Sequence, residues 1–149
     1  MGMLCCPIGV AVGIYISWNA VGKGWQLFYV HAGIAAFLTS TALWWLLIER
    51  KNSRSVGRGI VAGALSGCLA HYVCWYLQLL VIYFSYWFLG GPGSSLGEPP
   101  VDPLHGLWGA WVLSLWSWLL FGWITVLSGG ILGGCYRWFA NRGKNGPKG

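Results

Sequence analysis

Residues 59–89, GIVAGALSGCLAHYVCWYLQLLVIYFSYWFL, form a long apolar run that contains no Asp, Glu, Lys or Arg. As a straight helix it would extend about 46 Å, whereas the hydrocarbon core of a bilayer is about 30 Å thick. Such a run predicts a membrane-spanning helix that tilts in the bilayer or protrudes beyond it.

Three further apolar runs flank this one. Only 8% of the 149 residues are charged and 56% are hydrophobic, whereas about 25% of a soluble domain is charged. The sequence therefore predicts an all-α integral membrane protein. Its fold is expected to be a bundle of four transmembrane helices at about residues 4–21, 27–48, 59–89 and 104–134, which form a single transmembrane domain over 1–134.

Eight of the nine basic residues fall into two clusters, in the loop 49–58 and in the tail 135–149, and Lys23 is the exception. The loop 90–103 carries only the acidic residues Glu98 and Asp102. By the positive-inside rule both clusters face the cytoplasm, so both termini are cytoplasmic. We expect the tail to be flexible, and the membrane to be the inner (plasma) membrane of a bacterium. Asp102 followed by Pro103 also predicts a helix N-terminus.

Small residues recur at every fourth position in three of the spans. The glycines of these ladders are Gly9 and Gly13, then Gly59, Gly63 and Gly67, then Gly129 and Gly133. This spacing lets two helices approach closely, so we predict that these faces pack in a homo-oligomer or against another membrane protein. The first and third spans share the pattern, which is compatible with an internal duplication but also frequent in unrelated membrane helices.

His71 lies within the third predicted span, about 18 Å from the start of its helix. Cys74 and Gln78 lie on the same helical face, and the fourth span carries a second small and polar stripe. That stripe consists of Ala110, Ser114, Ser117, Ser128 and Cys135. An imidazole at this depth needs a partner, and Gln78, Cys74 and the serines are the candidates. The ring either joins two helices by hydrogen bonds or serves as a ligand or proton relay.

His31, His71 and His105 are weak candidates for binding haem or a metal ion, because no acidic or sulfur co-ligand accompanies them at a suitable spacing. No cofactor is therefore predicted. The five cysteines form no Cys-x-x-Cys pair, and no nucleotide, zinc-protease or serine-nucleophile motif occurs. The spans hold no charged residue, which counts against a pump and against a hydrolytic membrane enzyme.

The function that the sequence favours is a non-catalytic membrane subunit or scaffold, assembled through its glycine-rich helix faces. One alternative is a small-solute or ion transporter or channel formed by oligomerisation, with a pore lined by the His71–Gln78 stripe and the serines. Another is a haem- or metal-binding redox subunit. The net charge of +6 predicts attraction to anionic lipids and not to nucleic acid, because no soluble fold presents the charge. The 12 tryptophans are typical of interface anchors.

Overall fold

The computed structural model describes residues 1–20, 25–51, 55–91 and 98–144. This part of the chain is 89% helix and contains no strand. The elements are α1 (Gly2–Asn19), α2 (Phe28–Trp44), the π-helix η2 (Trp45–Glu49), α3 (Val56–Leu89), α4 (Pro103–Ser117), the π-helix η3 (Trp118–Gly122) and α5 (Trp123–Lys144). They form four helices long and apolar enough to cross a membrane, which confirms that the predicted spans are long apolar helices.

Two helices extend further into the basic segments than the sequence predicted. The third begins at Val56 instead of residue 59, and the fourth continues to Lys144 instead of ending at 134. Residues 135–144 of the predicted flexible tail therefore belong to α5, and 145–149 lie outside the described residues. Arg142 places its guanidinium carbon 3.7 Å from the centre of the Trp138 ring one helical turn earlier, a cation–π contact that stabilises this last part of the helix.

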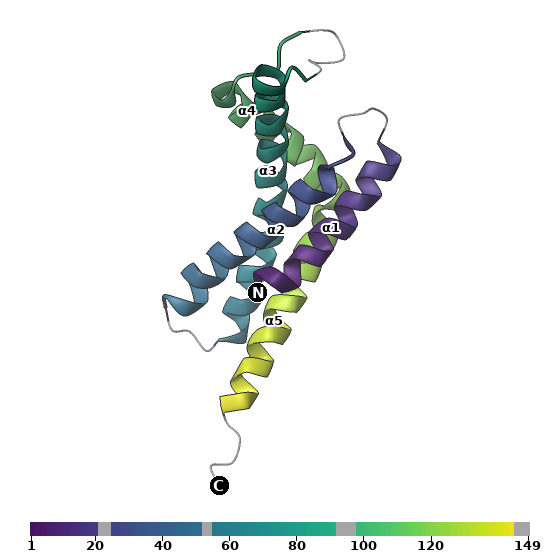
Figure 1. The fold of residues 1–149 in the computed structure, drawn as a ribbon. Helices are drawn as coiled ribbons and strands as arrows, with labels where there is room; N and C mark the ends of the chain where they lie inside the picture. The colour runs from purple at the N-terminus through teal and green to yellow at the C-terminus, as the bar shows by residue number, and fades with distance from the viewer. Residues whose placement is uncertain (21–24, 52–54, 92–97, 145–149) are drawn as a thin grey trace.

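The helices pair as two hairpins (Figure 1). α1 packs on α2, and α3 packs on α5 along one part of its length and on α4 along another. α2 also packs on α3 and so joins the hairpins, whereas α1 has little contact with α5. The end of η2, the start of α3 and the end of α5 lie toward one end of the molecule (Figure 1). The C-terminal ends of α1 and α3 and the starts of α2 and α4 lie toward the other (Figure 1).

The glycines of α3 face the backbone of α5. Three pairs oppose one another, Gly59 with Gly133, Gly63 with Gly129, and Gly67 with Thr125. A Cβ atom at Gly59 would lie 2.6 Å from the carbonyl oxygen of Gly133, and one at Gly63 would overlap the carbonyl of Gly129. The two backbones are therefore in direct contact along this line, which we call the α3–α5 seam.

The glycines of α1 have a similar place against α2. A Cβ at Gly9 would lie 2.6 Å from the carbonyl oxygen of Ala32, and one at Gly13 would meet the backbone of Tyr29. Each predicted glycine ladder thus has a partner within the same chain, whether or not copies of the chain also associate.

Asp102 is the N-cap of α4, as the sequence predicted. One carboxylate oxygen accepts hydrogen bonds from the backbone N–H groups of Leu104 (3.0 Å) and His105 (3.1 Å), and the other lies 2.6 Å from Nδ1 of His105. The backbone and side chain of His105, together with the Leu104 N–H, hold the pKa of Asp102 below its ordinary value. The cap is therefore expected to be fully ionised at neutral pH.

We expect this cap to fail only in acid. A carboxyl group whose folded-state pKa is lowered stabilises the fold at pH values above its unfolded pKa, and the stabilisation disappears as the pH falls through the folded one. A ¹³C NMR titration of the Asp102 carboxyl group in detergent micelles should give a midpoint below that of an ordinary aspartate. Asp102→Asn, which still caps but does not titrate, is the control. A midpoint at or above the ordinary value would contradict the assignment.

Candidate functional site

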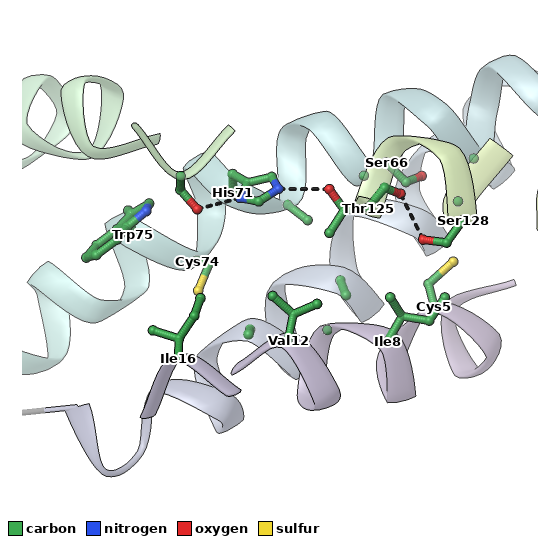
Figure 2. A pocket seen from close by; sticks show the side chains of 18 of the residues that line it. Cys5, Ile8, Val12, Ile16, Ser66, His71, Cys74, Trp75, Thr125 and Ser128 are labelled. Carbon is green, nitrogen blue, oxygen red and sulfur yellow. Dashed lines mark hydrogen bonds between the residues drawn. The ribbon is translucent and has the colours of Figure 1, made fainter. Parts of the chain in front are cut away.

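His71 is clamped between two hydroxyl groups of the fourth span. Its Nδ1 lies 2.7 Å from Oγ of Ser117 and its Nε2 lies 2.9 Å from Oγ1 of Thr125 (Figure 2). The Thr125 hydroxyl also lies 3.1 Å from the carbonyl oxygen of Gly122, to which it donates, so its oxygen accepts from the Nε2–H of His71. In the neutral imidazole Nδ1 then accepts from the Ser117 hydroxyl, so the network corresponds to the Nε2–H tautomer.

The π-helix η3 makes this clamp possible. Ser117 and Thr125 are eight residues apart, and in an unbroken α-helix they would point about 80° apart. A π-bulge inserts one extra residue into the helix without the rotation of about 100° that a residue normally adds. Ser117 and Thr125 are therefore oriented as if about seven residues, or nearly two full turns, separated them. η3 spans Trp118–Gly122, between the two hydroxyls, and therefore aligns them on the side that faces α3.

A cleft of about 60 Å³ lies beside the clamp, which we call the His71 cleft. Its walls differ in chemistry (Figure 2). From α1, Ile8, Val12 and Ile16 point into it, and across from them lie His71 and Thr125. The cleft thus has an apolar wall from the first helix and a wall with polar groups from α3 and the fourth span.

Two further serines line the polar wall. The hydroxyl of Ser66 donates to the carbonyl of Ala62 (2.7 Å), and that of Ser128 donates to the carbonyl of Ile124 (2.7 Å). Each hydroxyl therefore uses its proton within its own helix and keeps oxygen lone pairs that can accept a hydrogen bond.

Trp75 lines the same cleft with its indole ring. Its indole Nε1 is buried and has no hydrogen-bond partner among the described residues. The ring is held in place by Trp25 and Phe28, whose ring centres lie 5.5 and 5.3 Å away. Because the indole nitrogen is closed off from water-sized molecules, Trp75 contributes ring surface to the cleft and not a hydrogen-bond donor.

The other predicted site residues lie in several places. Cys74 lines the His71 cleft and is buried, whereas Gln78 hydrogen-bonds with His31 of α2. Ser114 donates to the carbonyl of Trp111 (2.8 Å) and does not line the cleft.

The three histidines likewise have separate partners. His71 contacts the two hydroxyls, His31 contacts Gln78, and His105 pairs with Asp102 near the surface. No group of three His, Cys, Asp or Glu residues that could hold a metal ion occurs in the described ranges.

Sequence reasoning missed Thr125 and misplaced Cys135. Thr125 begins a line at every fourth position with Gly129 and Gly133, and this signal could have been used to find it. Cys135, predicted on the small and polar stripe with Ser117, is exposed instead. The reason is η3, which rotates the residues after it relative to those before it.

The cleft is suited to an uncharged guest, because hydroxyl, indole and thiol groups line it and, among the described residues, no charged side chain does. Both nitrogens of His71 are already engaged, so the ring fixes the polar wall rather than offering a free base. Comparison of the chain with protein-family models, curated proteins and solved structures finds no match. The function is therefore inferred from the geometry.

Proposed function

We propose that the chain spans a membrane with both termini in the cytoplasm. Large apolar side chains such as Trp116, Leu119 and Ile131 are 65, 67 and 64% exposed, which suits contact with lipid. Arg50 and Lys51 follow η2, Arg58 lies at the start of α3, and these helix ends lie with the C-terminal end of α5, which carries Arg142, toward one end of the molecule (Figure 1). Asp102 belongs to the connection at the other end, which supports the same orientation by the positive-inside rule.

Within that membrane, the protein binds a small uncharged solute in the His71 cleft and lets it pass. The observation that supports this is the two-sided cleft, in which the apolar wall of α1 opposes a wall with oxygen acceptors. Its volume of about 60 Å³ leaves room for roughly four water molecules at about 15 Å³ each, which limits the guest to a few heavy atoms.

α1 is the wall best placed to move. It contacts α2 extensively and α5 only slightly, so the cleft can open along the α1–α5 side without loss of the α3–α5 seam. A pore between copies of the chain, as the sequence suggested, is not required, because the polar side chains converge within one chain.

Filling the cleft is expected to stop this passage. In Val12→Phe a ring enters the cleft from α1, whereas Val112→Phe adds the same ring at an exposed position of α4 outside it. In stopped-flow light scattering of proteoliposomes with water and urea as probes, we expect wild type and Val112→Phe to show equal flux. Val12→Phe should show a reduction of about tenfold or more, to the level of protein-free vesicles.

The result depends on folded protein, so all three samples are first compared by circular dichroism and gel filtration. Wild-type flux equal to that of empty vesicles, or unchanged flux in folded Val12→Phe, would overturn the proposal.

The assembled scaffold and the redox subunit stay predictions without a supporting observation. The glycine faces already have partners within the chain, so oligomers built on them would compete with α5 and α2. A haem or metal at His71 would have to displace Ser117 or Thr125.

A further inference from the structure

A second and larger cleft lies between α3 and α4 and shares no residue with the His71 cleft. It has a volume of about 950 Å³. Leu69 and Tyr72 of α3 form one side, and Leu107, Trp108, Trp111 and Trp118 form most of the other. No charged residue lines this cleft, which we call the α3–α4 groove.

The length of the groove matches one leaflet of a bilayer. From Leu107 to Trp118 it follows the helix for about 16 Å, and half of a hydrocarbon core is about 15 Å. Leu107 lies close to the N-terminus of α4, where Asp102 is the N-cap. Trp118 is the first residue of η3 and follows Ser117, so it lies at the depth of the two hydroxyls that contact His71. The groove thus runs from the interface on the Asp102 side to the middle of the membrane and ends there.

Aromatic side chains form much of the wall of the α3–α4 groove. Tyr72 and Trp111 meet edge to face with ring centres 6.3 Å apart, which fixes one indole beside α3. Trp108 and Trp118 are 74% and 46% exposed and leave the groove open on its outer side. A second helix, about 10–12 Å across with its side chains, would need a face that continues along the whole span, and this groove stops at Trp118.

From its length, depth and uncharged lining we propose that the α3–α4 groove holds one acyl chain of a phospholipid from the leaflet on the Asp102 side. The chain lies along α4 between Leu69 and the indoles of Trp108 and Trp111. This lipid is independent of the solute proposed for the His71 cleft.

The test is native mass spectrometry of the full chain, reconstituted in phosphatidylcholine vesicles and extracted in mild detergent. Wild type is expected to retain one phosphatidylcholine molecule. The double variant Trp108→Ala/Trp111→Ala should lose at least about 90% of that population, since it removes one wall. The control Trp116→Ala/Trp123→Ala removes two indoles that are equally exposed but lie outside the groove, and it should retain the lipid.

Three results would overturn the proposal. They are equal loss of lipid in both double variants, no retained lipid in wild type, or a wild-type dimer that the groove variant alone dissociates. The last result would assign the groove to a second copy of the chain. Circular dichroism of each variant excludes unfolding as the cause of a loss.

Discussion

Gly63→Ala is expected to separate α3 from α5, although it adds a single methyl group. The new Cβ would overlap the carbonyl of Gly129, and this contact is with backbone, which cannot rotate away as a side chain can. Overpacking of a core costs about 1–3 kcal/mol when side chains can adjust. We expect a loss of at least about 3 kcal/mol here, because the helices must move apart along the whole α3–α5 seam.

The measurement is the SDS fraction that unfolds the protein in mixed micelles, followed by far-ultraviolet circular dichroism. Gly106→Ala is the matched control, since a Cβ at Gly106 of α4 meets nothing within 4 Å. Alanine forms helices better than glycine by about 1 kcal/mol, so this control should be as stable as wild type or slightly more stable. If Gly63→Ala unfolded at the same SDS fraction as Gly106→Ala, the seam would not support the fold.

The spans could be predicted because a helix satisfies all of its backbone groups inside a membrane, so an apolar run of sufficient length has few other folds. The positions at which the helices begin and end could be predicted less accurately. Positive charge marks the end of the membrane but not the end of a helix, so α3 starts before Arg58 and α5 continues past Arg137.

The residues of the candidate site were likewise predictable only in part. His71, Cys74 and Ser117 could be placed on facing stripes from their spacing alone, since each lies in a regular stretch of helix. Spacing also puts Thr125 on the face of Gly129 and Gly133, but it does not align Thr125 with Ser117. That alignment comes from η3, and nothing in the residues WLLFG distinguishes a π-helical turn from an α-helical one. The apolar wall that α1 contributes to the His71 cleft could not be predicted either, because the spacing of residues within one helix does not show which other helix packs against that face.

Deletion of Leu119 is expected to leave the fold nearly intact. Leu119 lies within η3 and is 67% exposed. Without it, the five-residue π-helical segment can close as an ordinary α-helix, and Ser117 and Thr125 are then about seven residues, or nearly two turns, apart. Both hydrogen bonds to His71 survive, and the residues beyond the bulge keep their places against α3. The expected change in the free energy of unfolding is within about 1 kcal/mol of wild type, as for other substitutions that remove no buried contact.

Deletion of Leu65, also exposed but in the regular α-helix α3, has no bulge to absorb it. Every later residue of α3 turns by about 100°, so that Cys68 takes the place of Gly67 at the seam and Tyr72 that of His71. This should cost more than about 4 kcal/mol in the same SDS titration, because it overpacks the seam and removes the clamp together. Equal destabilisation by the two deletions would show that η3 does not set the register of the fourth span. A stable Leu119 deletion that keeps the ¹⁵N shifts of the His71 ring would show that the π-helix holds the one extra residue between the two hydroxyls.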